Sequence, residues 1–280
     1  MEVLRHEYNI NGVSGSRLFM QSWRAETQDS KGCVVITHGM AEHSECYHDL
    51  ATDLAENGWW VFAWDLQGHG KSQGKRGYIS DFSEFRKDLL KVVKHLKNHS
   101  EIPTTPMHLI GHSMGGLITL GALLEETMPA IQSAVLSSPA LGVAIEVPKI
   151  KHMASLWLNH LWPTLTMDNE IRYEILSRDP AMMDVYKRDP LRHTKVSAPL
   201  YLGMMEEMQR IKNSADRFTT PLFFQIAGDD RLVDAQASID FFKKLPGPKK
   251  LKIYEKSYHE IYNDINKEET IDDLLTFLAE

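Results

Sequence analysis

The residues that could perform nucleophilic chemistry on a carbonyl are a serine, a histidine and an aspartate in separate parts of the chain. The serine stands in Gly111-His112-Ser113-Met114-Gly115, a glycine–x–serine–x–glycine pattern. A hydroxyl is a weak nucleophile until a base takes its proton, and flanking glycines let neighbouring backbone pass close to it. The pattern is common by chance, so the surrounding chain must decide whether Ser113 is a nucleophile or an ordinary turn residue.

The chain on either side of Ser113 predicts a strand, a sharp turn and a helix. An apolar run at 107–110 precedes the serine, and a stretch of small and apolar residues at 117–124 follows it. In this context the turn strains the serine backbone and projects its oxygen from the edge of a parallel sheet. We expect the N–H of Met114, at the start of the helix, and the N–H of Met40, in the loop after an earlier strand, to bind an oxyanion.

A base and an acid are expected later in the chain, the acid first. Of the 13 histidines only His259 lies beyond Asp230, and it comes just after the last apolar strand. Asp229 and Asp230 both end a strand, and either carboxylate could orient the histidine; we favour Asp230. In this hypothesis His259 takes the proton of Ser113 and then protonates the leaving group, while the aspartate fixes the histidine tautomer.

Other polar loops are weaker candidates for chemistry. His38 and His43 could act as bases, although histidines beside a glycine turn more often hold the loop by hydrogen bonds. The glycine-rich turn at 65–72 has neither of the phosphate-binding spacings. The histidines and the two cysteines lack metal-ligand spacing, so we expect no metal and no cofactor.

Alternating strands and helices must position these groups, and they predict an α/β fold with a mostly parallel central sheet flanked by helices. Residues 5–10 and 17–23 predict an antiparallel hairpin at the sheet edge. The remaining strands are expected at 33–37, 60–64, 107–110, 134–137, 222–227 and 251–254. Helices are expected at 50–56, 82–96, 117–124, 235–245 and 268–279.

Residues 140–217 interrupt this alternation with helical pieces that are broken by prolines. A segment of this length between two strands predicts a helical cap inserted into a core formed by residues 1–139 and 218–280. Arg-Asp-Pro occurs at 178–180 and again at 188–190, and we interpret both as helix boundaries.

Within the cap, residues 149–162 predict a helix with one apolar stripe. The stripe comprises Ile150, Met153, Ala154, Trp157, Leu158, Leu161 and Trp162. One interpretation is that it packs on the core, so that Ile150, Met153 and Trp157 line an acyl-sized pocket. The other is that part of it, with Trp157 and Trp162, makes transient contact with a membrane or micelle surface.

Composition limits the classes of function. The chain has 280 residues, 42% of them hydrophobic and 25% charged, as in soluble globular proteins. Its net charge of −7 argues against a nucleic-acid partner. The first ten residues do not resemble a signal peptide, and no apolar run is long enough to span a membrane, so we expect a cytoplasmic protein that is at most peripheral at the membrane. The sequence does not specify an oligomeric state.

Five motifs in order resemble those of monoacylglycerol lipases and bacterial lysophospholipases in the α/β-hydrolase superfamily. They are H-G-M-A-E-H-S at 38–44, the turn at 65–72, G-H-S-M-G-G at 111–116, D-R-L-V-D at 230–234 and the segment 252–260. The resemblance implies an α/β-hydrolase with a cap that acts on a small lipid substrate, a single-chain acyl glycerolipid. It also favours Asp230 over Asp229 as the acid.

The chain is also similar to the α/β-hydrolase serine aminopeptidases, which keeps an amide substrate open. Acidic residues of the cap could bind the α-ammonium of such a substrate: Glu146, Asp168, Glu170 and Glu174. Basic residues lie among them, so the sequence does not decide between ester and amide. A non-catalytic binding protein of the same fold is a third hypothesis, disfavoured because serine, acid and histidine are all present.

Overall fold

An eight-stranded sheet forms the centre of the computed structural model, which describes residues 2–26, 30–100, 102, 106–144 and 148–280. The strand order is β1-β2-β4-β3-β5-β6-β9-β10. The strands are β1 (Val3–Asn11), β2 (Arg17–Ala25), β3 (Cys33–Thr37), β4 (Trp60–Trp64), β5 (Met107–His112), β6 (Ser133–Ser137), β9 (Leu222–Ala227) and β10 (Lys249–Tyr254).

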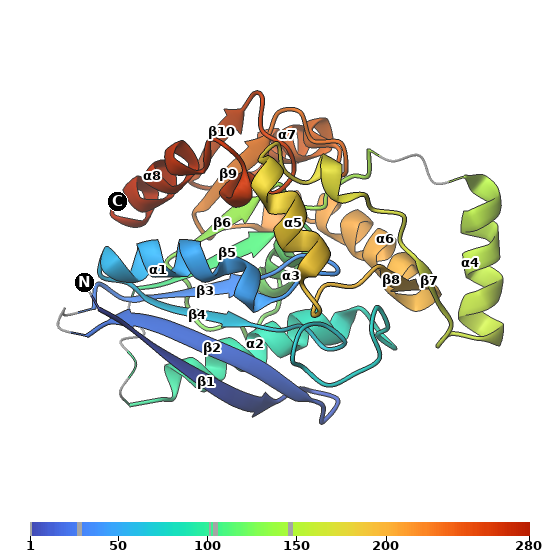
Figure 1. The fold of residues 1–280 in the computed structure, drawn as a ribbon, viewed down its shortest axis with the longest axis horizontal. Coiled ribbons are helices and arrows are strands. Elements are labelled where there is room, and N and C mark those ends of the chain that lie inside the picture. The colour runs from blue at the N-terminus through green and yellow to red at the C-terminus, as the bar shows by residue number, and fades with distance from the viewer. Residues whose placement is uncertain (1, 27–29, 101, 103–105, 145–147) are drawn as a thin grey trace.

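The sheet is mostly parallel, as the sequence predicts. β1 pairs antiparallel with β2 and β2 with β4, whereas β4-β3-β5-β6-β9-β10 run parallel. Strands β3, β5, β6 and β9 are buried along their whole length, because helices cover both faces of the sheet (Figure 1). This explains why these strands read as continuous apolar runs.

Helices cover the sheet in two layers, each with its own hydrophobic core. On one face lie α2 (Ser83–Lys97), α3 (Met114–Leu123) and α7 (Ala235–Lys244), and on the other lie α1 (His48–Glu56) and α8 (Lys267–Leu278). Phe85 and Leu117 belong to the first core and Leu54 and Leu274 to the second. Full burial of one such side chain contributes about 1.5–3 kcal/mol, so the two cores fix the sheet against which the loops are held.

The segment between β6 and β9 combines helices with a small sheet that the sequence did not predict. It contains α4 (Lys149–Leu161), α5 (Pro180–Arg188) and α6 (Ala198–Lys212). The two strands β7 (Thr166–Asp168) and β8 (Lys195–Ser197) pair antiparallel. Short 3-10 helices complete the described chain: η1 (Ser44–Tyr47), η2 (Tyr173–Ile175), η3 (Ala215–Arg217) and η4 (Ile261–Asn263).

The three helices of this segment relate differently to the sheet. α6 packs on α3 and contributes Leu200 and Ile211 to the first core. α4 packs on α6 and stands at the side of the molecule farthest from β1 (Figure 1). Asp179 caps the start of α5 by accepting the N–H of Ala181 at 2.9 Å, and Asp189 directly follows its end. The two Arg-Asp-Pro sequences are therefore helix boundaries, as predicted.

Candidate active site

Ser113 occupies a strained turn between β5, which ends at His112, and α3, which begins at Met114. Its φ is 53° and its ψ is −119°, a conformation that non-glycine residues rarely adopt. The flanking glycines are required by space: a Cβ on Gly115 would lie 2.1 Å from the carbonyl oxygen of Thr37. The turn therefore holds the serine side chain at the carboxyl edge of the sheet.

His259 contacts Asp230 and not Asp229. Its Nδ1 lies 2.7 Å from Oδ2 of Asp230, whose Oδ1 accepts the N–H groups of Leu232 and Val233 at 2.9 and 3.0 Å. Asp229 pairs with Arg231 at the surface, and its side chain is 47% exposed. Of the two aspartates that the sequence offered, only Asp230 is placed to orient the histidine.

The electrostatics of this pair suit a base held by an ionised acid. Burial raises the pKa of Asp230, but the charge and hydrogen bond of His259 and two backbone N–H groups lower it more, so the net shift is downward. Burial lowers the pKa of His259, whereas the Asp230 carboxylate raises it, and the net shift is upward. Asp230 is thus a carboxylate at neutral pH, and it is placed where its charge would stabilise an imidazolium at His259.

Ser113, His259 and both expected oxyanion donors line one cavity of about 170 Å³. Met114 is the first residue of α3, where backbone N–H groups have no partner within the helix. Met40 follows Gly39 in the loop after β3, and the N–H of Gly39 is held by the Glu42 carboxylate. The structure therefore brings the four predicted groups together around one cavity.

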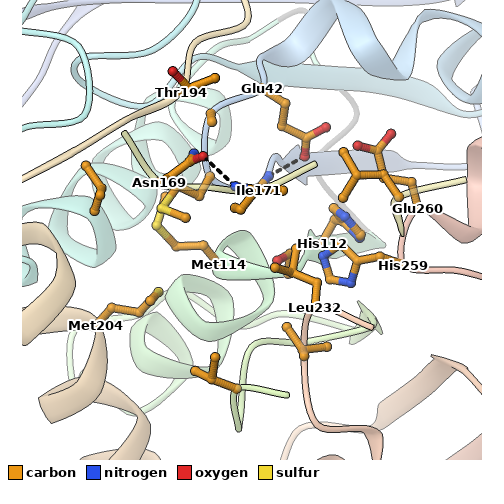
Figure 2. Close-up of a pocket in the computed structure, with 18 of the residues that line it drawn as sticks. Glu42, His112, Met114, Asn169, Ile171, Thr194, Met204, Leu232, His259 and Glu260 are labelled. Carbon is orange, nitrogen blue, oxygen red and sulfur yellow. Dashed lines mark hydrogen bonds between the residues drawn. The ribbon is translucent and has the colours of Figure 1, made fainter. Parts of the chain in front are cut away.

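The side of the cavity away from His259 is mostly apolar, although Asn169 and Thr194 also line it. Figure 2 shows Met114 and Met204 on the side away from His259 and Glu260. Further apolar lining side chains come from the segment between β6 and β9: Ile171, Tyr173, Leu176, Val196, Tyr201 and Met208. Such a lining, rich in flexible methionines, fits an alkyl chain.

The alternative bases hold loops, as expected. His38 is fully buried, hydrogen-bonds the carbonyl of Gly39 through Nδ1, and accepts the N–H of Leu66 through Nε2. Burial lowers its pKa to about 4, although the Asp65 carboxylate opposes the shift. His43 binds Asp189 through Nε2 at 2.8 Å. Neither histidine is among the residues that line the cavity.

The expectation that Ile150, Met153 and Trp157 line the pocket is not met. They are 78, 53 and 66% exposed, and the lining of the cavity does not include them. α4 packs on α6, and its buried residue is Ser155, so the face that carries Ser155 points inward. Positions two residues apart on a helix lie about 200° apart, so 153 and 157 point to solvent.

Sequence reasoning missed three charged residues of the site, Glu42, Glu260 and Arg192, all buried at the cavity. Glu42 lies within the 38–44 motif and Glu260 directly follows His259, so their positions carried a signal. Arg192 follows the second Arg-Asp-Pro, where nothing in the sequence marks it as a site residue.

One group of metal-ligand side chains occurs within the part of the chain that the structure describes. The ligand atoms of His43, Cys46 and Asp189 lie within 4.8 Å of one another. The group is separate from the residues that line the cavity, and its histidine and aspartate already bind each other.

A family model described as "Serine aminopeptidase, S33" matches residues 28–266. The chain belongs to this α/β-hydrolase family. It is 33% identical to the monoacylglycerol lipase of Mycolicibacterium smegmatis over 98% of the chain and 97% of that protein. It is 30% identical to the human monoglyceride lipase, over 92% of the chain and 84% of that protein.

Solved structures agree with this membership in the S33 family. The crystal structure of Paleococcus ferrophilus monoacylglycerol lipase superimposes with a TM-score of 0.82 at 29% identity, over 99% of this chain and 98% of that one. As an S33 family member related to lipases, the chain is an enzyme that hydrolyses carboxylic esters. In the described residues no helix is long and apolar enough to cross a membrane.

Proposed function

We propose that the protein hydrolyses single-chain acyl glycerolipids, monoacylglycerols or lysophospholipids, through Ser113, His259 and Asp230. The observation that carries the proposal is that the strained Ser113 turn and His259, which Asp230 holds, line the same mostly apolar cavity. The lipases among the relatives support the same substrate class.

The proposed reaction uses each group once in acylation and again in deacylation. His259 removes the proton of Ser113 as the serine oxygen attacks the ester carbon, and the N–H groups of Met40 and Met114 stabilise the oxyanion. His259 then protonates the leaving alcohol, which leaves an acyl-enzyme. Water then gives a proton to His259 and attacks the acyl carbon. The bond from that carbon to the Ser113 oxygen breaks, His259 returns the proton to Ser113 and the fatty acid leaves, while Asp230 holds the imidazole throughout.

The alternative, an aminopeptidase, needs an unpaired carboxylate to bind the substrate ammonium. Asp168 accepts hydrogen bonds from Thr194 and the backbone of residue 170, Glu170 pairs with Lys151, and neither these two nor Glu174 lines the cavity. Glu146 lies outside the described residues. The lining carboxylates Glu42 and Glu260 both face Arg192, which supports an uncharged acyl substrate.

A substrate panel tests this proposal. We expect monoacylglycerols or lysophosphatidylcholines to be hydrolysed, and aminoacyl amides to be turned over far more slowly, because the described residues that line the cavity offer apolar surface and no free carboxylate. Fatty-acid and amine release would be measured with equal concentrations of each substrate below its aggregation limit. Preferential cleavage of aminoacyl amides would contradict the proposal.

We also propose that residues 140–217 form a cap that contacts lipid surfaces. The segment supplies much of the apolar cavity lining, and α6 also contributes Leu200, Met208 and Ile211 to the first core. On α4 the apolar stripe faces solvent, with Trp157 66% and Trp162 59% exposed. An exposed apolar stripe on a helix is typical of interfacial helices, and this supports the second of the two interpretations.

For the double variant Trp157→Ser plus Trp162→Ser we expect reduced co-sedimentation with phospholipid vesicles and unchanged turnover of a short monomeric ester. Both side chains are exposed, so their loss removes membrane contact without opening the core. The matched control is Asn159→Ser plus His160→Ser, two exposed polar positions of the same helix. Equal vesicle binding by both variants, or none by the unmodified protein, would reject membrane contact through α4.

A further inference from the structure

Two carboxylates beyond Asp230 lie buried beside His259. Glu260 follows the histidine directly, and Glu42 belongs to the loop that presents Met40; they are 4 and 3% exposed. Figure 2 shows both at the cavity, with Glu260 beside His259. Buried carboxylates destabilise a fold unless a cation compensates them, so this pair requires a partner.

A single guanidinium serves both carboxylates. Nη1 and Nη2 of Arg192 lie 3.1 and 3.2 Å from the two oxygens of Glu260, and Nη2 lies 3.7 Å from Oε2 of Glu42. The guanidinium stacks on Tyr186 at 4.1 Å, and the arginine side chain is 5% exposed. Two parallel hydrogen bonds to one carboxylate fix orientation as well as charge.

This arginine joins three parts of the chain. It lies four residues beyond α5, whereas Glu42 follows β3 and Glu260 follows β10. Its neighbour His193 donates its N–H to the carbonyl of Ala41 at 3.2 Å. The segment inserted after β6 therefore contacts the loop of the oxyanion donor and the loop of the base through the same few residues.

The net charge around His259 depends on the contact of Arg192 with Glu42 and Glu260. The titratable groups that face His259 from the surrounding elements are Asp230, Glu260, Glu42 and His112, with Arg192 behind the two glutamates. Both glutamates raise the pKa of His259. Burial raises the pKa of Glu260, but Arg192 opposes it strongly enough to hold the value at about 2.

The other two groups, Glu42 and His112, carry less charge at neutral pH. Burial, followed by the charge of Glu260, raises the pKa of Glu42 to about 7 although Arg192 opposes the shift. Burial, followed by the charge of His259, lowers the pKa of His112 to about 3, so this histidine is neutral. Arg192 is therefore the cation that offsets the glutamates acting on His259.

We propose that Arg192 is a positioning residue through which the inserted segment keeps His259 able to accept a proton and holds the oxyanion loop in place. The proposal rests on the function proposed for Ser113, His259 and Asp230. Without Arg192 the two glutamates favour the imidazolium, which cannot act as a base. Hydrolysis then requires a higher pH.

The test compares pH profiles of Arg192→Gln, Arg192→Lys and the unmodified protein. We expect the acid limb of kcat/KM for a soluble ester, and of the rate of Ser113 labelling by a fluorophosphonate, to move upward by about one pH unit in Arg192→Gln. Near the limb this corresponds to about a tenfold loss of rate. Arg192→Lys keeps the positive charge, so its acid limb should lie close to that of the unmodified protein.

Arg178→Gln is the matched control. Arg178 also belongs to the inserted segment and binds a buried carboxylate beside the base loop, with Nε 3.0 Å from each oxygen of Asp264. That carboxylate also accepts the N–H groups of Tyr258 and Ile265, so its hydrogen bonds differ from those that join Arg192 to Glu260. The acid limb should stay in place in Arg178→Gln, even if the variant is less stable.

The outcomes separate this proposal from the one on which it rests. Two outcomes would overturn the role of Arg192 and leave the nucleophile untouched. One is an acid limb of Arg192→Gln that coincides with that of the unmodified protein, and the other is a limb of Arg178→Gln that moves as far as that of Arg192→Gln. Absence of labelling in the unmodified protein would overturn the nucleophile and Arg192 together. Should Arg192→Gln not fold, Glu260→Gln decides, because loss of one carboxylate should move the limb downward, and an unmoved limb would reject the proposal.

Discussion

Replacement of Ser113 by alanine is expected to lower kcat for ester hydrolysis by about 10⁴- to 10⁶-fold, as when a nucleophile of this kind is removed in other enzymes. The fold should be retained, because alanine keeps the Cβ and the backbone contacts of the turn, such as the Ser113 N–H to the carbonyl of Ser137 at 2.9 Å. Initial rates with a soluble ester, together with circular dichroism and thermal unfolding, measure both expectations.

The control for this variant is chemical labelling. The unmodified protein should be labelled by a fluorophosphonate at Ser113, and Ser113→Ala should not be labelled at all. Turnover of Ser113→Ala within tenfold of the unmodified rate, in a folded sample, would require another nucleophile.

The second large effect is expected at the acid. Asp230→Asn should lower kcat by about 10⁴-fold, because an amide in place of the carboxylate favours the wrong tautomer of His259 and cannot stabilise the imidazolium. The distance of 2.7 Å from His259 Nδ1 to Asp230 Oδ2 is the basis of this expectation.

Asp229→Asn is the matched control for the acid, because it makes the same chemical change one residue away. Asp229 forms an exposed ion pair with Arg231, and such pairs contribute little, so its replacement should change kcat less than about threefold. Kinetics of the two variants measured side by side decide between them, and the reverse ranking would assign the acid to Asp229.

Chain order and local apolar pattern were sufficient to predict the core of the fold and to place Ser113, Asp230 and His259 after the ends of strands in its sheet. The run at 222–227 coincides with β9, and the region predicted as a helix at 235–245 is α7 (Ala235–Lys244). The buried positions of these elements are marked by apolar residues in their own sequence, so each element can be predicted without knowing what packs against it. For the same reason the order of serine, aspartate and histidine pointed to one edge of the sheet.

The elements that escaped prediction depend on contacts between distant segments. β7 has three residues, too few to show a periodicity. The sequence of α4 shows that one face of the helix is apolar, but the packed structure shows that the face carrying Ser155 is the one that points inward. Arg192 acquires its role from residues about 150 positions before it and about 70 after it, a relation that no local pattern records.

The backbone conformation of Ser113 lowers the stability of the fold at the same residue that is proposed to act as the nucleophile. A side chain at φ 53° costs about 1–3 kcal/mol that the surrounding structure must supply, and glycine would adopt the same conformation without that cost. Selection for thermal stability alone would therefore favour glycine at the position where the proposed reaction needs a hydroxyl. Alanine does not relieve this conflict, since it keeps the Cβ, so an inactive glycine form is the better choice for trapping a bound lipid in a long-lived sample.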